Sequence, residues 1–185
     1  MTDDSRRDDE VADAKLIQRA RSGDDAALDV LVRRHHASAY RVALSITRRD
    51  DVAQDVVQDA FIKAFRALSG FRGDASFRTW MMTITANEAR AALRKRLRRS
   101  ESAIDDVGPI VADEVDPSEQ AVSGQEAARA RALLDTLPEK QRLSVSLRID
   151  EGLSFREIGE MIGSSEGAAR VNYFHGIRRL RELME

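Results

Sequence analysis

The sequence predicts an all-α protein in which an acidic, flexible linker joins two small helical bundles. Three observations lead to this fold class. Apolar residues recur three and four positions apart over most of the chain, which is the period of amphipathic helices. Residues 100–128 contain eight acidic residues and no basic one. Beyond position 122, three Ser or Thr residues are each followed three positions later by Glu, the capping box that begins a helix.

We therefore expect a disordered acidic tail (1–12), an N-terminal helical domain (13–99), an acidic linker (100–122) and a C-terminal helical domain (123–185). The net charge of −2 conceals this division. Residues 1–99 contain 20 basic and 15 acidic residues, a net charge of +5. Charge segregation of this kind indicates separate modules and a polyanionic partner for the basic one.

The composition excludes several classes of protein. Hydrophobic residues make up 42% of the 185 residues, which is too many for a wholly disordered chain. The absence of cysteine excludes disulfides, thiolate zinc sites and a cysteine nucleophile. No uncharged stretch reaches the roughly 18 apolar residues of a membrane helix, and residues 1–10 lack the apolar core of a signal peptide. We expect a cytoplasmic protein that is not itself a membrane protein.

Four helices are predicted in the N-terminal domain. A short helix follows Asp13, and a second one begins near Asp24. The third and fourth helices are expected at residues 50–68 and 76–99. Apolar side chains form one face of each of the first three helices. These side chains are Leu16, Ile17 and Ala20, then Leu28, Leu31, Val32, Val42, Ala43 and Ile46, then Val52, Val56, Val57, Ala60, Phe61, Ala64, Phe65 and Leu68.

The fourth helix combines aromatic and basic residues. Phe77 and Trp80 lie at its start, Phe71 lies in the preceding turn, and six cations follow between Arg90 and Arg99. A positive surface beside aromatic faces is typical of proteins that bind single-stranded or melted nucleic acid. Aromatic residues at helical spacing belong to a hydrophobic core more often than to a base platform. We accordingly assign Trp80 to the core.

The three capping boxes mark the expected helix starts after the linker. The segment 143–149 alternates like a β-strand, but its leucines also fit a helix, and the box before it favours the helix. The boxes pair Ser123 with Glu126, Thr136 with Glu139 and Ser154 with Glu157.

Residues 154–184 predict a helix-turn-helix, whose second helix lies in the DNA major groove. A short helix ends before Gly163, and the next one begins at Ser164 or Ser165. An ordinary helical hairpin has the same pattern, but it does not explain an outward aromatic residue at Phe174. The second helix is expected to direct Ala169, Tyr173, Gly176, Leu180 and Leu183 inward, and Arg170, Val171, Phe174, His175 and Arg178 outward.

Catalysis is not predicted. The adjacent His35 and His36 point to different faces of a helix, and the chain has no HExxH motif or Gly-rich phosphate loop. Paired carboxylates such as Asp24 and Asp25 lie at helix starts, where capping and the helix dipole explain them. We expect no catalytic residue, no metal, no cofactor and no small-molecule substrate.

Several segments together resemble a known family. The run DVVQDAFIKAFRAL from Asp55, the run FRGDASFRTW from Phe71 and the run ITAN from Ile84 resemble region two of the extracytoplasmic-function (ECF) sigma factors of bacterial RNA polymerase. The run LPEKQR from Leu137, followed by GLSFREIG from Gly152, resembles their region four. The resemblance covers nearly the whole chain from about Asp13, with the segments in the family's order and spacing.

The resemblance implies a two-domain promoter-specificity subunit that directs core RNA polymerase to promoters and helps to melt them. It implies three sets of site residues. Those for core polymerase are Asp55, Gln58, Asp59 and Ile62. Those for the minus-ten element are Phe71, Arg72, Asp74, Ser76, Asn87, Arg90 and Arg94. Those for the minus-thirty-five element are Arg170, Val171, Phe174, His175 and Arg178.

The resemblance also implies partners. They are the clamp helices of the polymerase β′ subunit, the flap of the β subunit, promoter DNA and an anti-sigma factor that can hold the protein at the membrane until a stress signal arrives. In the active state the protein is expected at the nucleoid. The reading helix departs from the family at Val171, Asn172 and Ile177, where Ser and two basic residues are common, so another member's promoter sequence cannot be carried over.

An alternative from the residues is a stand-alone helix-turn-helix regulator whose N-terminal half senses a signal or dimerises. Such a regulator binds intact duplex tightly without polymerase, whereas a sigma factor alone binds promoters weakly.

Overall fold

The computed structural model describes residues 2–102 and 132–184, and every regular element in these ranges is a helix. The all-α prediction is confirmed. The chain divides into two compact units, Met1–Leu93 and Arg94–Glu185. Both this division and the predicted boundary after Arg99 lie within one helix, which runs without a break from Phe77 to Ser102. The predicted linker and the box at Ser123 lie largely or wholly outside the described residues.

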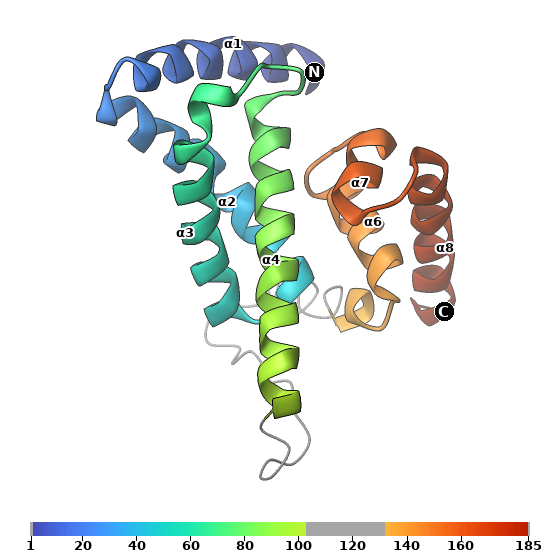
Figure 1. Ribbon diagram of the computed structural model, residues 1–185. Coiled ribbons are helices and arrows are strands. Elements are labelled where there is room, and N and C mark those ends of the chain that lie inside the picture. Colours follow the sequence, from blue (N-terminus) through green and yellow to red (C-terminus); the bar gives the residue numbers. More distant parts are fainter. Residues whose placement is uncertain (1, 103–131, 185) are drawn as a thin grey trace, which may run out of the picture. The chain divides into compact units, whose positions relative to one another are not determined.

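The N-terminal unit is built from four α-helices and one short 3₁₀ turn (Figure 1). Helix α1 lies across the ends of α3 and α4, while α2 packs along α3 (Figure 1). The elements are α1 (Thr2–Arg21), α2 (Asp25–Thr47), α3 (Asp50–Arg66), η1 (Leu68–Gly70) and α4 (Phe77–Ser102).

Residues 2–12, which we expected to be a disordered tail, belong to α1. The expectation was wrong because it gave too much weight to acidic composition. No glycine or proline separates this segment from the helix that follows Asp13. Extending a helix that has already formed adds one hydrogen bond for each residue that is fixed.

Helix α2 has well-defined ends. The Asp24 carboxylate accepts a hydrogen bond from the Ala27 N–H, as the capping pattern predicts. Arg19 donates to the same side chain at 2.8 Å, and this hydrogen bond lowers the pKa of Asp24 below its ordinary value. At the other end Arg48 adopts φ 57°, the left-handed conformation that usually selects glycine.

The core of the N-terminal unit follows the predicted apolar faces. Leu31, Val57 and Met81 are almost fully buried, and each comes from a different helix. Helix α4 begins where the Ser76 hydroxyl accepts from the Thr79 N–H at 3.1 Å. Phe77, which follows this cap, is only 3% exposed. Trp80, which we assigned to the core, is only half-buried, because it lies at the edge of the core beside the half-buried Phe71 ring.

The C-terminal unit contains a helical stretch at 132–135 and three longer helices. These are α6 (Glu139–Ile149), α7 (Phe155–Ile162) and α8 (Glu166–Met184). Residues 143–149 are therefore helical, and the strand alternative is wrong. The box at Thr136 is also wrong, because its hydroxyl donates to the Leu133 carbonyl of the preceding turn at 2.7 Å. Pro138, in an extended conformation, takes the N-cap position of α6 instead.

The helix-turn-helix follows the prediction closely. The Ser154 hydroxyl accepts from the Glu157 N–H, and Glu157 accepts from the Ser154 N–H at 2.7 Å, which completes the capping box. Gly163 ends α7 at φ 63°. Within α7, a Cβ at Gly159 would lie 2.9 Å from the Ser164 carbonyl oxygen, so only glycine permits the chain to turn back so closely.

Helices α6 and α8 approach each other at Gly176. A Cβ built there would lie 2.7 Å from Val145 Cγ2 and 3.3 Å from the Gln141 carbonyl oxygen. Ala169, one of the predicted inward residues, is buried on the same face of α8. Leu183 was predicted to face inward but is 47% exposed, because it lies in the final turn of the helix, beyond this contact.

Candidate nucleic-acid interface

The expected polymerase-binding residues form the outward face of α3. Asp55, Gln58, Asp59 and Ile62 are all exposed, and Ile62 is a large apolar side chain that remains 42% accessible. They lie one turn apart on a helix whose opposite face is buried, so the 3.6-residue period alone brings them together. A surface face with an accessible apolar residue among carboxylates is suited to a protein partner.

This face continues onto α2. A hollow beside Asp55 and Gln58 is also lined by His36 and Tyr40 of α2. The His36 ring is stacked parallel to that of Phe61, with 6.5 Å between centroids. Sequence reasoning missed these α2 residues because they are fifteen or more positions away from the α3 residues that they face.

The loop between η1 and α4 contains the first of the expected minus-ten residues. The Phe71 ring lies 4.9 Å from Trp80 and 5.9 Å from Phe77, so it is half-buried in a cluster of three aromatic rings. Arg72 and Asp74 form an exposed ion pair at 3.0 Å. The loop is therefore held at Phe71 and at the Ser76 cap, while the charged side chains between these points remain accessible to a ligand.

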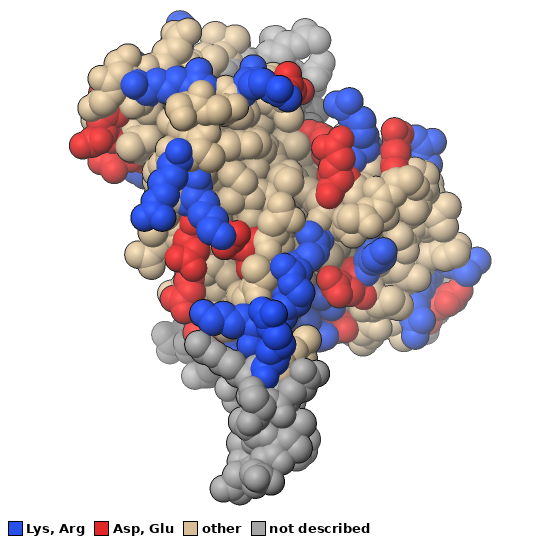
Figure 2. Space-filling model, in the orientation of Figure 1, with Lys and Arg blue, Asp and Glu red and all other residues tan. Residues whose placement is uncertain are grey.

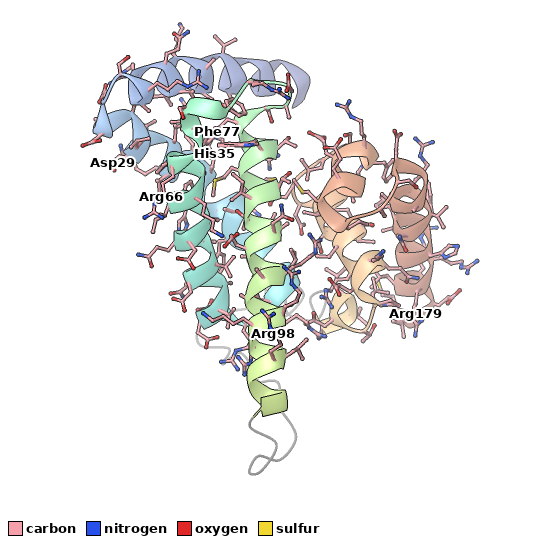
Figure 3. All side chains as sticks on the ribbon, in the orientation of Figure 1. Asp29, His35, Arg66, Phe77, Arg98 and Arg179 are labelled. Carbon is pink, nitrogen blue, oxygen red and sulfur yellow. The ribbon has the colours of Figure 1, made fainter. Side chains whose placement is uncertain are left out.

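The other expected minus-ten residues lie along α4. Asn87 and Arg94 are exposed and Arg90 is half-buried. Figure 2 shows basic side chains gathered over the C-terminal half of this helix, where Arg98 also projects (Figure 3). Lys63 of α3 donates to Glu88 at 2.6 Å, which ties the two helices together beside Asn87. The result is a cationic surface on the C-terminal half of α4, at the end of the helix away from the loop.

Two polar contacts join α1 to this region, and sequence reasoning found neither. Arg21 donates to the Leu68 carbonyl oxygen from Nη2 at 2.9 Å and also donates to the Phe71 carbonyl oxygen. Asp13 and His35 form a buried pair at 2.8 Å. The His35 ring lies 5.2 Å from that of Phe77, and Figure 3 shows the two side by side.

In the C-terminal unit, the five expected minus-thirty-five residues share the outward face of α8. Val171 and Phe174 are 52% and 58% exposed, and Arg170, His175 and Arg178 are also exposed. Arg170 pairs with Glu166 at 3.0 Å. Exposed apolar groups interleaved with cations are typical of a helix that contacts base edges and phosphates in a groove.

Phe155, at the start of α7, organises this face. The guanidinium carbons of Arg148 and Arg170 lie 5.0 and 5.3 Å from its ring centroid, within cation–π range. Tyr173 and Phe174 also contact the ring. The alternation of exposed and buried residues in α8 predicted the cations but gave no sign of the ring beneath them.

No group of three or more His, Asp or Glu side chains in the described ranges is arranged to hold a metal ion. Likewise, none of the helices within residues 2–102 and 132–184 is both long enough and apolar enough to span a membrane.

The two units correspond to two known sequence families. Residues 31–99 match sigma-70 region 2, and residues 133–182 match sigma-70 region 4. Together with the helical fold and the cationic surfaces, these matches define a transcription initiation factor.

Comparison with individual relatives and solved structures shows which family of transcription initiation factors the chain resembles. The chain is 31% identical to the ECF RNA polymerase sigma-E factor of Haemophilus influenzae over 96% of its own length and 95% of the relative's. Its fold is similar to that of CnrH in complex with the cytosolic domain of CnrY (TM-score 0.67, 27% identity, 94% and 97% of the two chains). It is also similar to the sigma factor RpoE bound to the anti-sigma factor NepR, from Bartonella quintana (TM-score 0.68, 22% identity, 84% and 95%).

The chain belongs to the ECF sigma factors and directs RNA polymerase to promoters. These findings give no support to the alternative of a stand-alone regulator with a sensing domain.

Proposed function

We propose that the two units divide promoter recognition between them, the N-terminal unit binding the minus-ten element and the C-terminal unit the minus-thirty-five element, and that the N-terminal unit helps to melt the DNA. The observation that carries this proposal is the outward face of α8. There two large apolar side chains, Val171 and Phe174, remain more than half exposed among cations. Exposing such groups without a partner has no structural advantage, whereas the major groove offers thymine methyl groups and phosphates.

On α8, Arg170 is the residue placed to read a base. Its guanidinium is held by Glu166 and by the face of Phe155, so less side-chain freedom is lost when it binds a guanine edge. Val171 and Phe174 supply apolar contacts to the bases, and His175 and Arg178 contact the phosphate backbone of the DNA.

In the N-terminal unit, the loop from Phe71 to Ser76 captures an unpaired base of the minus-ten element. Arg72 and Asp74 provide a donor and an acceptor on an accessible surface. Removing a base from its stack costs a few kcal/mol, which contacts of this kind offset. Asn87, Arg90 and Arg94 then hold the adjacent DNA along α4, where counterion release favours binding.

The exposed face of α3 binds the clamp helices of the polymerase β′ subunit, and the C-terminal unit binds the flap of the β subunit. In this role the polymerase supplies the chemistry, so the protein needs no catalytic residue, metal or cofactor of its own. An anti-sigma factor is a further partner, since the similar fold of RpoE was solved with NepR. Such a partner blocks the α3 face and can retain the protein at the membrane, away from the nucleoid, until stress releases it into the cytoplasm.

The direct test is transcription with purified core RNA polymerase and genomic promoters. Transcripts should appear only when the full-length chain is added, and the chain should co-purify with the core enzyme. Failure to co-purify would contradict the proposal at its base.

The surfaces are tested by substitution in the same assay. Asp55→Ala combined with Asp59→Ala should weaken core binding while leaving the melting temperature nearly unchanged, because both carboxylates are exposed. Asp29→Ala, an exposed carboxylate on α2, is the control and should bind normally.

Arg170→Ala should lower transcription from promoters with an intact minus-thirty-five element by about tenfold or more. Equal loss on promoters without that element would show that α8 does not read it.

A further inference from the structure

Helix α1 contacts the loop before α4 through the backbone of that loop. Arg21 Nε and Nη2 both donate to the Leu68 carbonyl oxygen, at 3.1 and 2.9 Å. Nη2 also donates to the Phe71 carbonyl oxygen, 50 residues further along the chain. The planar guanidinium thus bridges the first and last residues of the turn that leads into the loop, which a shorter or single-donor side chain cannot do.

The two carbonyl oxygens mark the point from which the loop departs. Leu68 is buried, and its carbonyl oxygen also accepts from the Phe71 N–H at 3.2 Å, so this end of the loop has a fixed position. Phe71 then places its ring against Trp80 of α4. The guanidinium therefore sets the direction in which the chain leaves the turn, immediately before the charged residues Arg72 and Asp74.

A second contact from α1 supports the other end of the loop. Asp13 is buried and accepts from His35 at 2.8 Å and from Arg34 at 3.1 Å. His35 lies against Phe77, the first residue of α4, and Phe77 contacts Phe71. Both ends of the loop are thus connected to one helix, by different contacts.

We infer that α1 is a positioning element for minus-ten recognition and that Arg21 is its principal positioning residue. This inference rests on the proposed role of the loop in base capture. It adds a determinant of promoter opening that lies outside the stretch matched to sigma-70 region 2, which begins at residue 31. Arg21 does not touch DNA in this role. It restricts the loop to the conformation that accepts a base, and thereby reduces the entropy that is lost when the base binds.

The test uses holoenzyme assembled from core polymerase and the full chain, on a promoter that the wild-type holoenzyme opens. Arg21→Met removes the three hydrogen bonds but retains an unbranched side chain, and the hollow that Arg21 borders with Phe65, Leu68 and Ser69 leaves room for it. Lys15→Met is the matched control, because it removes one positive charge from an exposed position of the same helix. Arg21→Lys retains the charge but not the planar fork.

Two quantities are measured for each variant: affinity for core polymerase, and the rate of opening on promoters that carry each of the four bases at one minus-ten position. 2-Aminopurine at that position reports the unstacked base. Arg21→Met should lower the opening rate on the preferred base by about tenfold and reduce discrimination between bases by a similar factor, with core affinity within about twofold of wild type. For Arg21→Lys, the opening rate and the discrimination should lie between those of Arg21→Met and the wild type. Lys15→Met should behave as wild type.

Unchanged discrimination in Arg21→Met would overturn the inference, and so would an equal loss of core binding and opening, which indicates a purely structural role. If Arg21→Met does not fold, Arg21→Lys decides: wild-type discrimination in that variant shows that the fork is not needed. Asp74→Ala separates the two proposals. If it leaves discrimination unchanged, base capture by the loop is wrong. If it lowers discrimination and the Arg21 variants do not, only the positioning role fails.

Discussion

The two units position their candidate DNA-binding surfaces in opposite ways. In the C-terminal unit, the contacts that fix the start of α7 and the turn before α8 join residues close in sequence: Ser154 with Glu157, and Gly159 with Ser164. In the N-terminal unit, the loop before α4 is held by Arg21, whose partners lie 47 and 50 residues away. The comparison teaches that contacts within a short segment determine the conformation of the helix-turn-helix. The conformation of the loop depends instead on a contact from a helix that is distant in the sequence.

The largest expected effect comes from breaking the close contact between α6 and α8 in the C-terminal unit. Gly176→Leu should destabilise this unit by about 3 kcal/mol, because its Cβ would overlap Val145 and the backbone of α6. Gly167→Leu is the control, since a Cβ at that position meets no atom within 4 Å. Hydrogen exchange measured on peptides from each unit checks the prediction. Equal loss of protection in both units would contradict the independence of the two.

The next largest effect is expected at Asp13 of α1, which accepts hydrogen bonds from two residues of α2. Asp13→Ala leaves His35 and Arg34 without their shared acceptor, one of them buried, and should cost about 2 kcal/mol. Asp9→Ala, an exposed residue of the same helix, should cost almost nothing. Urea unfolding followed by fluorescence of Trp80, the only tryptophan, reports this unit alone. A stable Asp13→Ala variant would show that the buried pair contributes little.

A smaller effect is expected at the capping box that begins α7 in the C-terminal unit. Ser154→Ala removes the acceptor for the Glu157 N–H and should cost about 1 kcal/mol. Ser164→Ala, whose hydroxyl makes only a 3.4 Å contact with the next residue's carbonyl oxygen, is the matched control. Hydrogen exchange in α7 is the measurement. If both variants lose the same protection, the capping box is not what fixes the start of α7.

The smallest effect is a pH dependence confined to the N-terminal unit. The Arg19 hydrogen bond lowers the pKa of Asp24 from its ordinary 3.8, so the folded state favours the ionised carboxylate. The stabilisation of the folded state by ionised Asp24 is complete above pH 3.8, and it is lost as the pH falls through the lowered pKa of the folded state. Asp24→Asn should therefore reduce the acid dependence of unfolding in that range, measured against wild type by Trp80 fluorescence. An identical pH profile in the variant would exclude the contribution.

Local signals in the sequence predicted most of the helices and the exposure of most site residues. The caps at Asp24, Ser76 and Ser154 were predictable because each is satisfied within three residues. Thr136 has the same spacing to a Glu, but Pro138 moves the helix start two residues along, and a spacing rule does not register that shift. The helix at 2–12 was missed because composition describes a segment by itself and ignores the helix that it continues.

The contacts that organise the sites were not predictable in this way. Arg21 and Asp13 look in the sequence like ordinary surface charges of an amphipathic helix, and only the fold brings them to the loop and to His35. Phe155 is likewise a single aromatic at a helix start until α7 and α8 cross and place Arg170 over its ring. Side-chain period gives the face on which a residue lies, but not what the neighbouring helix places there.

Arg21 binds carbonyl oxygens, which every amino acid possesses, and it does not bind the side chains of the loop. Exchanges at Ser69, Gly70 or Arg72 through Ala75 therefore leave its acceptors in place. A lineage can alter the chemistry that it presents to a promoter at these positions without rebuilding the support beneath them. New start-site preferences thus become accessible by single substitutions in a scaffold that stays constant.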